Sequence, residues 1–240
     1  MPHSGNEKIP HLAAVTFALP DESRDFVAKL RGARQIRRGS LPVFVGALGE
    51  KQIAVCHTGV GAESCRERIT DFLKNHQPKY LISSGFAGGL DPVLKVGDLV
   101  LAENFTDPTL LAKAHLQNVR VGKLTTQPAV AETVTDKAAL ASQTGAFAVD
   151  METATISELC ALHGVPMLSL RGISDSAADD LPVSFSIWFD EKKQKPRVGA
   201  LLWELATHPK NISPFAKFVR GIPPTRKRMT TALCELLGGM

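Results

Sequence analysis

Short apolar runs alternate with segments of helical periodicity through the first 170 residues of this 240-residue chain. The runs at 11–19, 80–82 and 166–170 are almost continuously apolar, which is typical of strands buried on both faces. Between them, 62–76 and 152–163 carry apolar residues at helical spacing. This order of elements predicts an α/β fold in which helices cover a mainly parallel sheet.

Turn residues and shorter apolar runs complete the expected elements. Further strands are expected at 42–48, 52–56, 97–103, 119–124 and 146–149, and further helices at 20–30, 137–142, 198–206, 213–219 and 226–237. Gly49-Glu50-Lys51 predicts a hairpin between the first two of these strands. A chain of this length buries a core without a disulfide or a metal.

The net charge of +4 is unevenly distributed along the chain. Residues 191–240 hold ten Lys and Arg against three Asp and Glu, a net charge of +7, which leaves −3 on residues 1–190. Such a basic segment is either a solvated helical face or a surface for an anionic partner. One Tyr and two Trp leave few stacking surfaces, so we expect no nucleic-acid partner.

Metal sites and membrane spans are not expected from the composition. The four cysteines form no CxxC pair, and no histidines stand at zinc-ligand spacing. No apolar run approaches the roughly 18 to 20 residues of a membrane span. The polar residues 1–10 also lack the apolar stretch of a secretory signal. We therefore expect a cytoplasmic protein.

Glycine-rich or acidic loops follow several of the predicted strands. They are Gly59-Val60-Gly61, the glycines of 84–89, Asp150-Met151-Glu152 and Ser174-Asp175. Read alone, the glycines fit tight turns, and carboxylates at a helix N-terminus contribute only about 0.3–1 kcal/mol through the dipole. The dinucleotide fingerprint fails because residue 64 is Ser. Together, however, these loops predict one ligand site at the carboxyl ends of the strands.

Five motifs in order resemble the purine nucleoside phosphorylase/nucleosidase superfamily. They are TGVG (58–61), SGFAGGL (84–90), KVGDLV (95–100), VDMETATI (149–156) and RGISDSA (171–177). The resemblance implies a three-layer α/β/α fold around a mixed, partly closed sheet. It also implies an enzyme that cleaves the N-glycosidic bond of a purine-type nucleoside with water or phosphate. No metal or organic cofactor is implied.

The resemblance also implies roles for individual residues. Glu152 resembles the carboxylate that binds the ribose hydroxyls, and Asp175 resembles the acid that bonds N7 of the departing purine. Glu22 resembles the carboxylate that activates water in the methylthioadenosine/S-adenosylhomocysteine nucleosidase branch. The expected substrate contacts are Gly59, Phe86, Ala87, Gly88, Met151, Glu152 and Ser174. Whether Asp175 is protonated beforehand, or only as N7 gains electron density, stays open.

Two departures from the family pattern bear on the reaction. Phe86 stands where phosphorylases place a serine, which removes a phosphate donor and favours hydrolysis. Arg24 and Arg66 are candidates for an anion clamp, although a solvated or packing role is favoured for each, and Arg171 is expected to be a structural ion-pair partner. The segment 125–134 lacks the aromatic residue that nucleosidases place over the purine.

The C-terminal segment predicts a division of the chain into a catalytic core, 1–180, and a basic helical extension, 181–240, packed on the same domain. Asp180-Leu181-Pro182, Leu201-Leu202 and His208-Pro209 resemble the hopanoid-associated phosphorylase-like branch, which suggests an adenosyl-linked lipid as an alternative substrate. Lys and Arg near anionic headgroups contribute about 1 kcal/mol each, so weak membrane-surface contact is expected. The resemblance further implies a homodimer or a larger homo-oligomer.

Two rival functions remain at this point. The chain could be a phosphorylase that uses inorganic phosphate as a co-substrate. It could also be a non-catalytic nucleoside-binding module. The joint presence of Glu22, Glu152 and Asp175 favours an enzyme over a binding module.

Overall fold

A computed structural model describes residues 12–240, so the polar segment 1–10 lies outside the described residues. Ten strands of the described chain form one sheet in the order β2-β3-β4-β1-β5-β10-β6-β7, with β9 on β5 and β8 on β9. The strands are β1 (Ala13–Phe17), β2 (Arg31–Arg37), β3 (Pro42–Leu48), β4 (Lys51–His57), β5 (Tyr80–Gly89), β6 (Leu99–Ala102), β7 (Val119–Gly122), β8 (Leu124–Thr126), β9 (Ala148–Asp150) and β10 (Met167–Asp175). A separate hairpin joins β11 (Phe189–Asp190) to β12 (Lys195–Pro196).

The sheet is mixed and open. Its centre, β4-β1-β5-β10, is parallel, whereas β2 and β3 on one side and β6 on the other join it antiparallel. The branch starts where β9 pairs antiparallel with the end of β5. Among the described residues no ladder joins β7 to β8, so the sheet does not close into a barrel. The expected mixed α/β fold is confirmed, in an open form.

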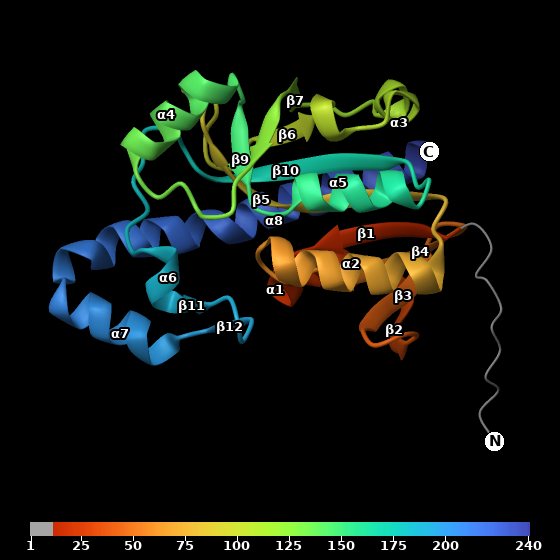
Figure 1. The fold of residues 1–240 in the computed structure, drawn as a ribbon, viewed down its shortest axis with the longest axis horizontal. Coiled ribbons are helices and arrows are strands. Elements are labelled where there is room, and N and C mark those ends of the chain that lie inside the picture. Colours follow the sequence, from red (N-terminus) through yellow and green to blue (C-terminus); the bar gives the residue numbers. More distant parts are fainter. Residues whose placement is uncertain (1–11) are drawn as a thin grey trace.

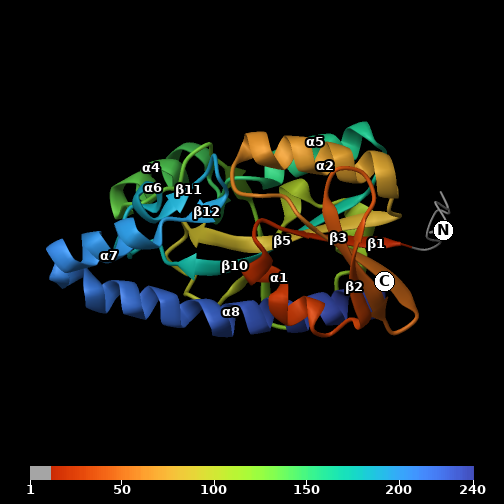
Figure 2. The same cartoon turned by 90° about the horizontal axis from the view of Figure 1, so that it is seen from below.

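Helices cover both faces of the sheet (Figure 2). They are α1 (Pro20–Val27), α2 (Ala62–His76), α3 (Pro108–Lys113), α4 (Val134–Thr144), α5 (Thr153–Leu162), α6 (Phe185–Trp188), α7 (Val198–Thr207) and α8 (Ile212–Gly239), with short 3-10 turns at Glu103–Phe105 and Pro209–Asn211. In β1, Val15 packs in the cluster under α1 and α8, while Ala14 packs in the cluster under α2 and α5. This burial on both faces explains the continuous apolar run of the first strand.

Four expectations about individual elements differ from the structure. The strand expected at 119–124 is two strands, of which β7 pairs with β6 and β8 pairs with β9. β2 is not expected from the sequence, because RGARQIR is polar and the strand is exposed apart from the half-buried Ile36. β5 continues to Gly89 through the segment expected to be a glycine loop. The separate helices expected at 213–219 and 226–237 are one 28-residue helix, α8, which runs through Pro223 and Pro224.

The second half of α8 packs closely on β10. A Cβ added at Gly172 would lie 2.7 Å from Thr225 Cγ2 and 2.8 Å from Met229 Sδ, so only glycine permits this approach. Arg226 is buried and pairs with Asp25 at 2.8 Å and with Asp21 at 3.1 Å, both on α1. Packing therefore holds the helix together across the proline pair and ties it to α1.

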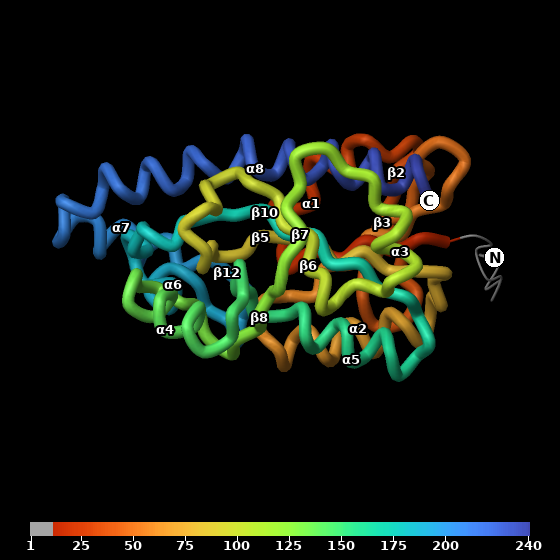
Figure 3. Tube along the Cα trace, turned by 90° about the horizontal axis from the view of Figure 1, so that it is seen from above, coloured from red at the N-terminus to blue at the C-terminus, as the bar shows by residue number. Residues whose placement is uncertain are grey.

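The first half of α8 and α7 form, with α6 and the β11–β12 hairpin, what we call the C-terminal arm, residues 185–222. Figures 1 and 3 show α7 and the start of α8 reaching past the end of the sheet. Within residues 12–240, no helix is long and apolar enough to cross a membrane. The division of the chain at residue 180 stays a prediction.

Candidate active site

A small cavity lies where β1 and β4 end and α1 and α5 begin, beside the middle of β5. Its volume is about 30 Å³. Its walls include Thr16, Glu22, Ser84, Phe86, Glu152 and Arg171. The hydroxyls of Thr16 and Ser84 are buried and have no hydrogen-bond partner among the described residues. A polar cavity of this size holds about one water molecule and is too small for a nucleoside.

Glu22 reaches the cavity from the first turn of α1, which Pro20 starts. Its Oε2 accepts a hydrogen bond from the Ala18 backbone N–H at 3.2 Å. A Cβ at Gly85 would lie 3.1 Å from the same oxygen, so glycine makes room for the carboxylate. Burial raises the pKa of Glu22 to about 7, against the opposing effects of the Ala18 hydrogen bond and the Arg171 charge.

Glu152 faces the same cavity from the residue before α5. Its Oε1 accepts a hydrogen bond from the Gly61 backbone N–H at 2.8 Å. Burial, and then the negative charge of Asp150, raise the pKa of Glu152 to about 8. Glu22 adds to this rise, so the two cavity carboxylates oppose each other's ionisation.

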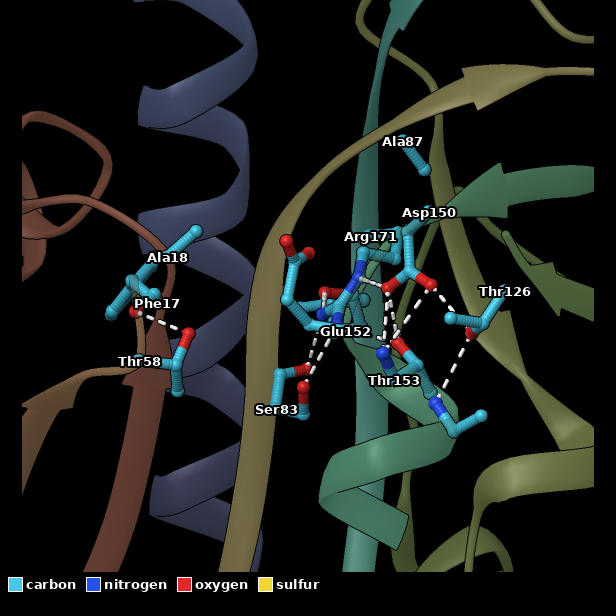
Figure 4. A network of polar contacts seen from close by, with 12 residues as sticks. Phe17, Ala18, Thr58, Ser83, Ala87, Thr126, Asp150, Glu152, Thr153 and Arg171 are labelled. Atoms are coloured by element: carbon cyan, nitrogen blue, oxygen red, sulfur yellow. Dashed lines mark hydrogen bonds and ion pairs between the residues drawn. The ribbon is translucent and has the colours of Figure 1, made fainter. Parts of the chain in front are cut away.

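Arg171 forms the wall of the cavity and is fully engaged (Figure 4). Its Nε donates to Asp150 Oδ2 at 2.9 Å, which confirms the expected structural ion pair. Both Nη atoms donate as well, to the oxygens of Ser83, the Leu170 carbonyl and Thr153 Oγ1. All five guanidinium N–H groups therefore have protein acceptors. We call Ser83, Asp150, Thr153 and Arg171 the Arg171 cluster.

Asp175 lies outside the cavity wall, at the end of β10, where it is in register with Gly88 of β5. Its Oδ1 accepts a hydrogen bond from Ser174 Oγ at 2.6 Å. Its Oδ2 forms an ion pair with Lys137 Nζ at 2.6 Å. A Cβ at Gly88 would lie 3.2 Å from Oδ2, so glycine leaves the carboxylate room. Ser174 Oγ also lies 3.2 Å from the Ala87 carbonyl, beside β5, but its single proton serves the closer Asp175 oxygen.

Met151 packs in an aromatic cluster supplied by the C-terminal arm. Met151, Val60 and Phe189 are buried together, and Phe185 and Trp188 pack against them. Val130, from the segment that lacks the expected aromatic residue, joins the same cluster. The aromatic density of 185–189, FSIWF, is the sequence signal that could have pointed to this arrangement.

The β11–β12 segment also covers the 59–61 loop. Gln194 accepts a hydrogen bond from the Val60 N–H at 2.7 Å and donates to the Val60 carbonyl at 2.9 Å. Gly59, with φ of +73°, adopts a conformation that favours glycine, and a Cβ there would lie 2.9 Å from Gln194 Oε1. The segment is thus anchored to the loop whose Gly61 N–H donates to Glu152.

Known proteins are similar to this chain in sequence and in fold. The family model of the phosphorylase superfamily matches residues 13–115 and 104–205. The chain belongs to the phosphorylase superfamily. A 5′-methylthioadenosine/S-adenosylhomocysteine nucleosidase of Marinomonas sp. (strain MWYL1) is 28% identical over 201 residues, which cover 70% of this chain and 87% of the relative. A nucleosidase of the same name from Staphylococcus epidermidis (strain ATCC 12228 / FDA PCI 1200) is 24% identical over 212 residues, 75% of this chain and 93% of that one.

Solved structures show the same superfamily fold. The S. pneumoniae 5′-methylthioadenosine/S-adenosylhomocysteine nucleosidase with the transition-state inhibitor MT-ImmA has a TM-score of 0.72 at 20% identity, over 95% of this chain and 99% of that chain. A futalosine hydrolase mutant of Helicobacter pylori strain 26695 has a TM-score of 0.71 at 17% identity, over 96% and 100%. At these identities the likeness establishes the fold.

The expected site residues fall into three groups along β5 and the C-terminal arm. Glu22, Phe86 and Glu152 line the cavity. The second group, on the Asp175 side, is Ala87, Gly88, Ser174 and Asp175. The third, Gly59 and Met151, lies against the arm. Their roles stay predictions.

Arg24 and Arg66, the candidates for an anion clamp, have the solvated role that the sequence favoured. Arg24 is exposed and pairs with Asp21 at 2.9 Å, and Arg66 is exposed and pairs with Glu158 at 2.8 Å. Two residues in contact with the expected site were not predicted from the sequence. Lys137 contacts Asp175, and Gln194 of the arm contacts the 59–61 loop. Among residues 12–240, no group of three or more His, Cys, Asp and Glu could hold a metal ion.

Proposed function

We propose that this member of the phosphorylase superfamily cleaves the N-glycosidic bond of a purine-type nucleoside with water. The observation that carries the proposal is the water-sized cavity between Glu22 and Glu152, two carboxylates whose pKa values lie at about 7 and about 8. The names of the relatives, 5′-methylthioadenosine/S-adenosylhomocysteine nucleosidases, support the reaction class.

In this proposal Glu22 is the general base. A base with a pKa near the working pH removes a proton from water efficiently, and burial has brought Glu22 to this range. As C1′–N9 breaks, positive charge develops on the ribose, and Glu152 stabilises it while accepting hydrogen bonds from the ribose hydroxyls. The bonding electrons pass to the base, whose N7 faces Asp175. Side chains supply every charge the reaction needs, so we propose no metal or organic cofactor.

Hydrolysis fits the cavity better than phosphorolysis. Arg171 is the positively charged residue in its wall, and its five donors are already bonded to protein oxygens. Phe86 adds an apolar ring where a phosphate donor would be needed. Thr16 and Ser84 offer two hydroxyls, which suffice to orient a water.

A panel of nucleosides tests the proposal. It would hold the sugar constant and vary the base, then hold adenine constant and vary the 5′ group through hydroxyl, methylthio, homocysteinyl and alkyl-lipid substituents. We expect the protein to release free base from at least one purine nucleoside. The variant Glu22→Gln should be folded and at least about 10²-fold slower. Tight binding of a nucleoside with no base release by the wild type would instead indicate a binding module.

The C-terminal arm supports a second, separate proposal, contact with an anionic lipid surface. It exposes large apolar side chains, Val198 (58%), Leu202 (62%), Trp203 (72%), Ile212 (50%) and Val219 (46%). Lys210, Lys217 and Arg220 are exposed in the same segment. Exposed Trp and Leu beside Lys and Arg are typical of segments that lie in the membrane interface.

Vesicle sedimentation at low salt tests the arm. We expect binding to vesicles that contain phosphatidylglycerol, weaker binding to pure phosphatidylcholine, and loss of binding in Trp203→Ser. The matched control is Val121→Ser, because Val121 is 52% exposed on β7, outside the arm. Equal binding of wild type and Trp203→Ser would contradict the proposal. The homo-oligomeric state and the cytoplasmic location stay predictions, and light scattering tests the first.

A further inference from the structure

Lys137 is a buried lysine with no role in the reaction proposed above. It lies on α4, and its side chain is fully buried. Its ammonium has three acceptors: Asp175 Oδ2 at 2.6 Å, the Ser176 carbonyl at 2.9 Å and the Asp179 carbonyl at 2.6 Å. These three acceptors match the three N–H groups of a protonated lysine. The geometry therefore describes a charged ammonium held against Asp175.

Such a pair is expensive for a protein to bury. Removing both charges from water costs several kcal/mol per ion, and apolar residues of similar volume often give equal or greater stability. Stability alone therefore does not account for a lysine at this position. Buried charged pairs beside a ligand site are instead candidates for a role in the reaction.

The hydrogen bonds of Asp175 bear on the source of the proton for the departing base. Ser174 donates to one carboxylate oxygen and Lys137 to the other, an arrangement suited to an ionised carboxylate. An ionised carboxylate has no proton to give to a departing base. The nearest proton to its Oδ2 is on Lys137 Nζ.

We propose that Lys137 is a positioning residue: its ammonium holds, beside Asp175, the proton that the departing base takes up through Asp175. This inference rests on the proposed function. As the C1′–N9 bond breaks, its electron pair moves to the base and N7 becomes basic. Lys137 Nζ passes a proton to Asp175 Oδ2 and becomes a neutral amine, and Asp175 passes that proton to N7. The water oxygen bonds to C1′ and its proton goes to Glu22, and solvent then returns Glu22 and Lys137 to their starting forms.

The charges around Lys137 are consistent with this role. Asp179 follows β10, accepts a hydrogen bond from Ser176 Oγ at 2.5 Å and lies 3.8 Å from Lys217 of α8. On α4 itself, Asp136 is turned to the helix cap at Thr133. Asp180 accepts a hydrogen bond from the Val134 N–H at 2.7 Å. Among these carboxylates, Asp175 is the one in contact with the ammonium, so it is the path for the proton.

The test compares leaving groups that differ in their need for a proton. Lys137→Met should lower kcat for a purine nucleoside by about 10²–10⁴-fold at pH 8, the usual contribution of a general acid. With a riboside of 4-nitrophenol, whose anion is stable without a proton, the same variant should lose less than about threefold. Lys137→Arg, which keeps the charge, should recover part of the purine activity.

The pH profile gives a second readout. Without the ammonium, Asp175 must carry the proton itself, so the alkaline fall of kcat should begin at lower pH in Lys137→Met than in the wild type. A merely structural role would lower kcat equally for both ribosides and leave the pH of the alkaline fall unchanged. That result would overturn the inference. If Lys137→Met does not fold, Lys137→Gln, whose amide can still donate to one carbonyl, replaces it in the same comparison. Failure of the wild type to release any purine base would overturn the proposed function instead.

Discussion

Two buried regions of the molecule place a cation against a carboxylate. They differ in whether the carboxylate is surrounded by protein donors or lies beside the residues expected to contact substrate. In the Arg171 cluster, Asp150 also accepts hydrogen bonds from Thr126 Oγ1 at 2.7 Å and from the Thr153 backbone. Beside Lys137, Asp175 stands at the end of a strand, with the carboxylate held against glycine. The first pair is closed by the protein, whereas the second lies next to residues expected to contact substrate. Similar burial and distances thus accompany a scaffold in one region and proposed chemistry in the other.

The largest expected effect is on activity, in the Lys137 region. Asp175→Asn keeps the size of the side chain but removes the carboxylate that passes the proton from Lys137 to the base, so kcat should fall by about 10²–10⁴-fold. Steady-state base release measures it, and Asp180→Asn is the matched control, because Asp180 is exposed and bonded to the Val134 N–H. Full activity of Asp175→Asn would remove the distinction drawn between the two regions.

The next effect is on stability, in the Arg171 region. Arg171→Met leaves Asp150 buried without its cation, so the free energy of unfolding should fall by about 3–5 kcal/mol. Arg171→Lys keeps a charge but cannot reproduce the five donors, and should lie between the variant and the wild type. Urea unfolding followed by circular dichroism measures both. A change below 1 kcal/mol for Arg171→Met would show that the cluster is not a scaffold.

The smallest expected effect is the pH dependence of activity and stability that Glu22 causes, in the cavity between the two regions. Because the base Glu22 and the ribose carboxylate Glu152 must both be ionised, kcat/KM should rise as the pH passes through about 7 and about 8, their pKa values, and fall steeply below them. Stability has the opposite dependence on pH. Between pH 4.5 and about 7, Glu22 holds a proton in the folded state that it has lost in the unfolded state. The free energy of unfolding therefore falls as the pH rises through this range. Thermal unfolding of Glu22→Gln should show less of this decline.

Much of the fold and of the site could be predicted from local sequence. The continuous apolar strands and the glycines and carboxylates at their ends are short-range patterns, which predicted the sheet and pointed to Glu152 and Asp175 as site residues, whereas Glu22 came from the family resemblance. β2 escaped because an exposed, arginine-rich strand has no apolar alternation. The continuity of α8 escaped because it depends on packing against Gly172, far away in sequence.

Lys137 shows most clearly what local sequence omits. A single lysine in an amphipathic helix is typical of a solvated face, and its neighbours in sequence give no other indication. Its burial is created by the turn at 176–179, whose carbonyl groups point at the ammonium. That turn is about 40 residues away, so only the tertiary structure brings the acceptors and the lysine together.

The most direct test of the central claim is the identity of the sugar product. The reaction should be run to completion with the best nucleoside of the panel, with and without excess inorganic phosphate, and analysed by phosphorus and proton NMR. We predict free sugar and free base in both cases, at a rate that phosphate leaves unchanged, because the cavity between Glu22 and Glu152 admits water. Formation of a sugar 1-phosphate, or base release that requires phosphate, would contradict this account.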